Sequence, residues 1–131
     1  WGISLSTYLE DKHYESAIFL PELSEYLKTG NFLNHFQSRI VGLSSNLSRN
    51  EIDHQDQYEE YRIMGCCVYN MLNVIRGSYK SFSNPIGAYC WDILAGFNLS
   101  LEHGLKVTVD GKEYEGQFLL PNKKYSFSIQ R

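Results

Sequence analysis

The stretch YRIMGCCVYNMLNVIRG, residues 61–77, carries the clearest helical pattern in the chain. Its apolar side chains recur at intervals of three and four residues, which places them on one face of an α-helix. These side chains belong to Tyr61, Met64, Val68, Met71, Leu72 and Ile75. Gly77 follows at the position where glycine commonly ends a helix. The pattern predicts a helix whose apolar stripe faces a core.

Helical spacing also extends to both sides of this stretch. Residues 21–29 begin with Pro21, which suits the first turn of a helix. Residues 32–43 and 85–97 repeat the three-and-four spacing. We therefore expect a helical body of about four helices within residues 1–104.

The period of the apolar residues changes at Leu105. From there apolar and polar residues alternate, as in a strand, at Leu105, Val107, Val109, Tyr125, Phe127 and Ile129. Asp110-Gly111 is a hairpin turn signal between the first two strands. Residues 105–131 thus predict a three-stranded antiparallel meander, and residues 1–9 alternate in the same way and could join it. The expected fold is a single α+β domain over residues 1–131, with the meander following the helical body.

Composition and charge restrict the function classes. The chain has 131 residues, 43% of them hydrophobic, and a formal net charge of -3. A nucleic-acid binder that relies on a basic face is therefore not expected, although helices followed by a hairpin match the layout of a winged helix. No apolar run approaches the roughly 20 residues needed to cross a bilayer.

The N-terminus and the cysteines suggest a compartment. The chain starts at Trp1 without a methionine, which predicts a domain cut from behind a leader or a membrane anchor. On neighbouring helices, Cys67 and Cys90 could face one another and form a disulfide, leaving Cys66 as the odd thiol. The alternative is that both are small buried hydrophobic residues in a reducing compartment. We expect a periplasmic or otherwise extracytoplasmic location, with the cytoplasm as the alternative.

Catalytic and metal-binding motifs are missing from the sequence. It contains no nucleophile elbow, metalloprotease motif, phosphate loop or dinucleotide fingerprint. It also has no Cys-x-x-Cys pair at the spacing of zinc ligands. These observations predict no catalytic residue, no metal ligand and no cofactor, and we expect no small-molecule ligand.

An acidic segment and the histidines are the candidate binding features. The segment EIDHQDQYEE, residues 51–60, could dock a basic partner or could be a solvated helix start. The candidate contacts in this segment are Glu51, Asp53, Asp56, Tyr58 and Glu59. His54 lies among these carboxylates, and together with His103 it is a candidate for a pH response.

These features predict a domain that binds a protein. The first hypothesis is a non-enzymatic accessory or sensory partner of a membrane-anchored regulator in the bacterial envelope, supported by the ten tyrosines, which favour interfaces. The second is a small acidic immunity-type inhibitor that blocks a basic toxin through residues 51–60. The third is an unrecognised enzyme, which predicts a pocket lined by histidines and carboxylates.

Overall fold

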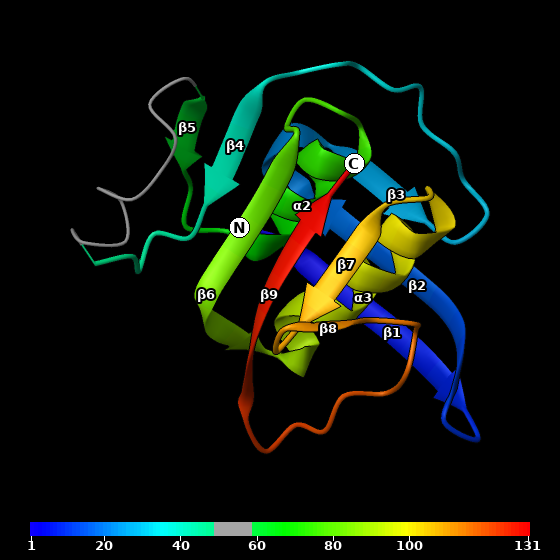
Figure 1. Cartoon of the computed structure of the whole chain (residues 1–131). Coiled ribbons are helices and arrows are strands. Elements are labelled where there is room, and N and C mark those ends of the chain that lie inside the picture. Colours follow the sequence, from blue (N-terminus) through cyan, green and yellow to red (C-terminus); the bar gives the residue numbers. More distant parts are fainter. Residues whose placement is uncertain (49–58) are drawn as a thin grey trace.

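Two helices lie between two β-sheets in the computed structural model, which describes residues 1–48 and 59–131 (Figure 1). The helices are α2 (Cys67–Ile75) and α3 (Cys90–Glu102). Each contacts strands of both sheets, so the described part of the chain has three layers in the order sheet, helices, sheet. Because a sheet lies on either side, the helices carry buried side chains over most of their surface.

The first sheet has three antiparallel strands, β1 (Ile3–Leu9), β2 (Lys12–Leu20) and β3 (Glu25–Lys28). A short 3-10 turn, Pro21–Leu23, joins the second strand to the third. Residues on successive positions point to opposite faces of a sheet. The inner face buries Ile18, Leu20 and Leu27, whereas the outer face exposes Ile3, Leu5, Phe19 and Tyr26.

The second sheet has six strands in the order β5-β4-β6-β9-β7-β8. The strands are β4 (Ile40–Leu43), β5 (Glu60–Ile63), β6 (Ser81–Tyr89), β7 (Lys106–Val109), β8 (Lys112–Glu113) and β9 (Lys124–Gln130). Strand β4 runs parallel to both β5 and β6, and the remaining pairs are antiparallel. The sheet is therefore mixed, and its central strand pair, β6 with β9, joins segments that lie far apart in the sequence.

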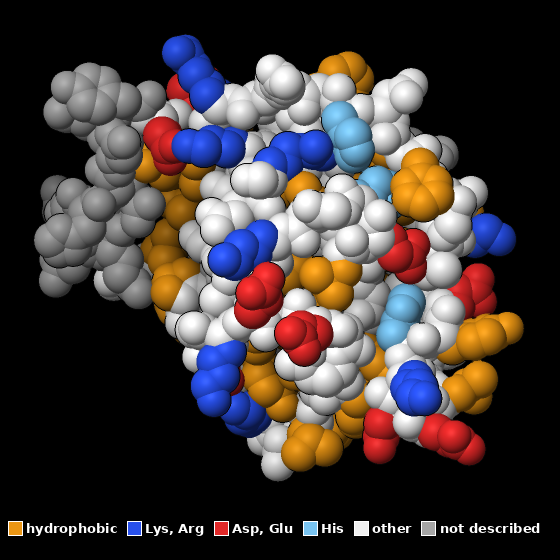
Figure 2. All heavy atoms as spheres, turned by 45° about the vertical axis from the view of Figure 1, so that its right-hand side comes forward, with side chains coloured by type: hydrophobic (Ala, Val, Ile, Leu, Met, Phe, Trp, Pro, Cys, Tyr) orange, Lys and Arg blue, Asp and Glu red, His pale blue; other side chains and the backbone are white. Residues whose placement is uncertain are grey.

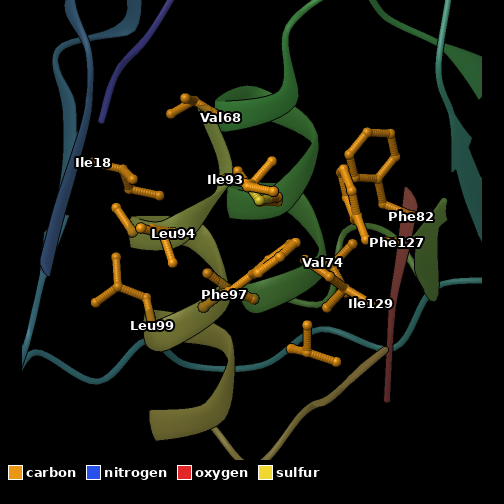
Figure 3. Packing of buried hydrophobic residues seen from close by; sticks show 14 of the residues in the cluster. Ile18, Val68, Val74, Phe82, Ile93, Leu94, Phe97, Leu99, Phe127 and Ile129 are labelled. Atoms are coloured by element: carbon orange, nitrogen blue, oxygen red, sulfur yellow. The ribbon is translucent and has the colours of Figure 1, made fainter. Parts of the chain in front are cut away.

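The core fills the space on both sides of the helices (Figure 3). Phe97 of α3 is fully buried, and its ring centroid lies 5.0 Å from that of Phe127 and 5.3 Å from that of Tyr114. Asn98, on the same helix, donates from Nδ2 to the hydroxyl of Tyr8 at 2.8 Å and accepts at Oδ1 from the hydroxyl of Tyr114 at 3.1 Å. A buried amide with partners on both of its atoms links α3 to β1 and to the segment after β8.

The expected helical body of about four helices is wrong. Residues 21–28 form the 3-10 turn and β3, and residues 40–43 form β4. The helix expected from residue 61 begins only at Cys67, because Glu60–Ile63 pair with β4 as a strand. These short segments satisfy helical spacing, but long-range strand pairing overrides that local preference.

The expected C-terminal meander is also wrong as an independent unit. Strands do form at Ile3–Leu9, Lys106–Val109 and Lys124–Gln130, and Asp110 and Gly111 make the hairpin turn with φ angles of 47° and 77°. However, β9 pairs with both β6 and β7, and β1 belongs to the other sheet.

Figure 2 shows Lys and Arg side chains interspersed with Asp and Glu on the visible face, with hydrophobic side chains exposed between them. Among residues 1–48 and 59–131, no helix is long and apolar enough to span a membrane.

Replacing Phe97 by alanine is expected to destabilise the protein by about 3–5 kcal/mol, because it leaves a cavity between the helices and the six-stranded sheet. Chemical denaturation followed by circular dichroism measures this change. Phe36→Ala is the control, since that ring is 64% exposed and its loss is expected to cost less than about 1 kcal/mol. Equal effects of the two substitutions would contradict the assigned core.

Candidate functional site

A pocket of about 220 Å³ lies where the N-terminal ends of both helices meet the six-stranded sheet. Its walls come from the segment after β4, the loop before α2, strand β6, the first turn of α3 and the start of β9. The lining residues are Ser44, Ser45, Asn46, Met64, Gly65, Cys67, Phe82, Asn84, Gly87, Ala88, Tyr89, Asp92 and Lys124. Ser44 directly follows β4, so the pocket lies outside the carboxyl end of a parallel strand, where open α/β sheets commonly bind ligands.

Both helices start at this pocket without a side-chain cap from the residue before them. In Figure 3 the helices run in the same direction, from Val68 to Val74 and from Ile93 to Leu99, so their N-termini lie at the same end. The residues preceding them, Cys66 and Tyr89, make no side-chain hydrogen bond to the first turn. The first N–H groups of a helix have no acceptor within it and carry a partial positive charge, so this end of the layer favours an anion.

Asp92 is the carboxylate of the pocket. It lies in the first turn of α3, and partial burial raises the pKa of its side chain. The charge of the same carboxylate also changes the pKa of the neighbouring Cys67 thiol. Burial, and then the charge of Asp92, raise the pKa of Cys67 to about 11. At neutral pH, Cys67 is therefore a thiol and not a thiolate.

An irregularity in β6 shapes the wall of the pocket that this strand forms. The register of β6 with β9 shifts between Asn84 and Ala88. Gly87 adopts φ +89° there, and a Cβ on it would lie 2.9 Å from the backbone of Tyr125. The Asn84 side chain is buried, accepts from the backbone N–H of Gly87 at 3.0 Å, and also hydrogen-bonds to Cys67. The bulge thus fixes an amide side chain against the thiol.

Lys124 supplies the positive charge of the pocket. It pairs across the sheet with Tyr89, and its ammonium group lies 5.6 Å from the centroid of that ring. The ring of Tyr89 stacks on Trp91 with centroids 4.5 Å apart. The aromatic pair therefore holds the lysine beside the first turn of α3 by a cation–π contact.

The described residues of this pocket do not by themselves offer the ligand set of a divalent cation. Within the described ranges, no three His, Cys, Asp or Glu side chains gather where they could hold a metal ion. Calcium takes six to eight oxygen ligands, most of them carboxylates and carbonyls. Among the described lining residues Asp92 is the single carboxylate, and it lies near a neutral thiol and shares the pocket with an ammonium group.

The predicted acidic docking segment falls mostly outside the described residues. Glu51, Asp53, His54, Asp56 and Tyr58 lie in the range 49–58, of which nothing is described. Glu59, the remaining member, is described. Its carboxylate forms an ion pair with Lys80 and accepts from the hydroxyl of Tyr61 at 3.5 Å.

The pH response of His103, the described candidate, stays a prediction, and the structure shows which groups its ring contacts. Its Nδ1 donates to the carbonyl of Leu99 at 2.7 Å, and its Nε2 accepts from the backbone N–H of Leu33 at 3.4 Å. The ring also contacts Phe32 and His35. These partners engage both ring nitrogens, so His103 anchors the chain after β3 to the end of α3.

The predicted Cys67–Cys90 disulfide is wrong. All three cysteines are free thiols, and Cys90 is buried. They therefore follow the alternative, in which cysteines serve as small buried or half-buried side chains. The argument for an oxidising compartment depended on this disulfide and no longer applies.

Sequence reasoning missed every residue of the pocket except Cys67. Asn84, Asp92 and Lys124 come from separate elements, and no spacing connects them. One local signal was present. Asp92 is the single charged residue in the apolar run CWDILAGF, residues 90–97.

Comparisons with known proteins find no match by sequence but a clear similarity in fold. No protein-family model matches the chain, and no curated protein matches it. The fold is similar to that of a Ca-bound IMPase family protein from Staphylococcus aureus, with a TM-score of 0.76 and 19% identity over 97% of this chain and 53% of the other. An IMPase/NADP phosphatase complexed with NADP and Ca²⁺ gives a TM-score of 0.76 and 19% identity over 97% and 54%. An inositol monophosphate-bound IMPase-II gives 0.72 and 16% over 98% and 57%.

This likeness establishes the fold, and the chain spans about half the length of the solved structures it matches. It contradicts the expected non-enzymatic accessory domain, because the proteins that share the fold are phosphatases of the inositol monophosphatase (IMPase) family. It equally contradicts the expectation that no small molecule is bound, since those proteins are solved with products, NADP or inositol monophosphate. The alternative of an unrecognised enzyme agrees better with these findings.

The reactivity of the Cys67 thiol reports on the electrostatics of the pocket. Its alkylation by iodoacetamide is expected to rise with pH to a midpoint near 11, because only the thiolate reacts. In Asp92→Asn the midpoint is expected to fall, since one cause of the raised pKa is removed. Peptide mass spectrometry measures the rate at Cys67, with the urea-unfolded protein as the control. A midpoint near 8.5 in the folded protein would contradict the assigned environment.

Proposed function

We propose that the chain forms the phosphate-binding part of an enzyme that hydrolyses small-molecule phosphate esters, with Asp92 at the reacting centre. One observation carries the proposal. Two helices begin, without side-chain caps, at a pocket that also holds an ammonium group and a carboxylate. The likeness in fold to inositol monophosphatase-family phosphatases supports the same class of substrate.

The pocket offers suitable partners for a phosphate group. Backbone N–H groups at a helix N-terminus bind phosphate oxygens by hydrogen bonds and by the helix dipole. Lys124 adds a full positive charge at the rim, and the hydroxyls of Ser44 and Ser45 can donate to further oxygens. These groups differ in kind from the apolar lining of a pocket that binds hydrophobic ligands.

Asp92 provides the base for hydrolysis. A carboxylate with a raised pKa holds a proton more strongly than an ordinary aspartate, which favours general base catalysis near neutral pH. In the proposed reaction the oxygen of a water molecule bonds to phosphorus while its proton passes to the Asp92 carboxylate. The bond between phosphorus and the ester oxygen breaks, and the ester oxygen takes up a proton from solvent water and leaves as the alcohol. Inorganic phosphate forms, and Asp92 then returns its proton to solvent.

The proposal is tested by release of inorganic phosphate from inositol monophosphate and from NADP, each measured with and without added divalent cations. Hydrolysis of at least one ester is expected. Asp92→Asn is expected to lower kcat by about 100-fold or more, because the amide cannot take up the proton of water.

Glu113→Gln is the matched control, since it makes the same chemical change at an exposed residue of β8 outside the pocket. Its kcat is expected to equal that of the unmodified chain. The proposed function is wrong if no condition releases phosphate, or if the two substitutions lower kcat equally.

A further inference from the structure

The outer face of the three-stranded sheet carries large apolar side chains that are exposed. Ile3 pairs with Phe19 and Phe19 pairs with Tyr26, so these three side chains form one row across the sheet. They are 47%, 37% and 54% exposed. Leu5, which is 60% exposed, follows on the same face of β1. An antiparallel sheet with one face in water normally places polar residues on that face, so this face has the composition of a buried one.

The sequence of β2 shows the same property. Residues 17–20 read AIFL, without a polar residue. Ile18 and Leu20 fill the core, whereas Phe19 lies on the outer face. A continuous apolar run is typical of a strand that is covered on both faces, and exposed apolar patches mark interaction surfaces. We therefore expect a further layer of protein on this face.

Two charged side chains of opposite sign lie farther along the same face. Ala17 of β2 pairs with Leu5 and with Lys28 of β3. Glu15 lies two residues from Ala17 on β2, and alternate residues of a strand share a face. An identical face therefore offers a lysine to each glutamate and a glutamate to each lysine, whereas a strongly acidic or basic partner would meet one like charge.

We infer that the outer face of the three-stranded sheet is the interface of a symmetric dimer, in which it packs on the same face of a second copy of this chain. In a twofold interface every contact occurs twice, so Glu15 of each copy can pair with Lys28 of the other while the apolar side chains pack between the two sheets. The pocket that holds Asp92 lies against the six-stranded sheet, so the inference goes beyond the proposed function and does not rest on it.

The size of the face sets the strength that we expect. Four large side chains that are about half exposed, together with their smaller neighbours, offer roughly 500 Å² on each copy. Two copies would bury roughly 1,000 Å² in total, which is near the lower limit for a specific interface. The dimer is therefore expected to be in equilibrium with the monomer at micromolar concentrations.

Sedimentation velocity of the 131-residue chain, at concentrations from about 1 µM to about 200 µM, measures this equilibrium. The mass is expected to rise with concentration from 15.2 kDa toward twice that value. Leu5→Lys is expected to stay monomeric, because the dimer would bury two added ammonium groups. Leu120→Lys is the matched control, since Leu120 is 58% exposed and lies outside the three-stranded sheet, and it is expected to associate like the unmodified chain.

The charged pair gives a second test. Lys28→Glu places two carboxylates on each face and is expected to weaken association by about tenfold or more. Adding Glu15→Lys to that variant restores one charge of each sign and is expected to recover most of the association. A general loss of structure caused by the first substitution would not be reversed by the second.

A chain that stays monomeric at the highest concentration overturns the inference. The face is then left for a further polypeptide segment, since the matched structures are longer than this chain. Association that persists in Leu5→Lys overturns it as well, because another surface is then responsible. Circular dichroism checks that each variant keeps the fold, and phosphate release tests the proposed function separately.

Discussion

The close approach of α2 and α3 at Gly96 is the contact on which the rest of the structure depends. A Cβ on Gly96 would lie 2.3 Å from the sulfur of Met71, a side chain that is fully buried and enclosed on all sides. Glycine therefore lets the two helices form one thin layer. Each sheet then covers one side of that layer, and the core residues of both sheets reach the same pair of helices.

The same contact explains where the chemistry lies. Because the helices are parallel neighbours, their N-termini lie at one end of the layer, beside the carboxyl end of β4 (Figure 1). The bulge at Gly87 brings Asn84 to that end, and cross-strand pairing with Tyr89 brings Lys124. The pocket is thus a product of packing, and its polar groups hardly interact until the sheet and the helices have assembled.

Sequence patterns predicted those elements whose residues make their contacts locally. The alternation at Val107 and Val109 and the Asp110-Gly111 turn identified a hairpin, because a tight turn depends on the backbone angles of two adjacent residues. Residues 21–28 were misread because four or five apolar positions fit a helix and a short strand equally well. Asp92, Asn84 and Lys124 were missed because their proximity comes from the pairing of β6 with β9. A single sequence contains no local pattern that identifies such long-range pairings.

The position of the helices between two sheets affects how fast their backbone amides exchange hydrogen with solvent. Amide hydrogens of α3 bond to carbonyl oxygens within a helix that a sheet covers on either side, so we expect them to exchange with deuterium slowly. Strand β1, at the edge of the three-stranded sheet, has one row of backbone groups without a neighbouring strand among the described residues. We therefore expect faster exchange at the free edge of β1 than at the helices.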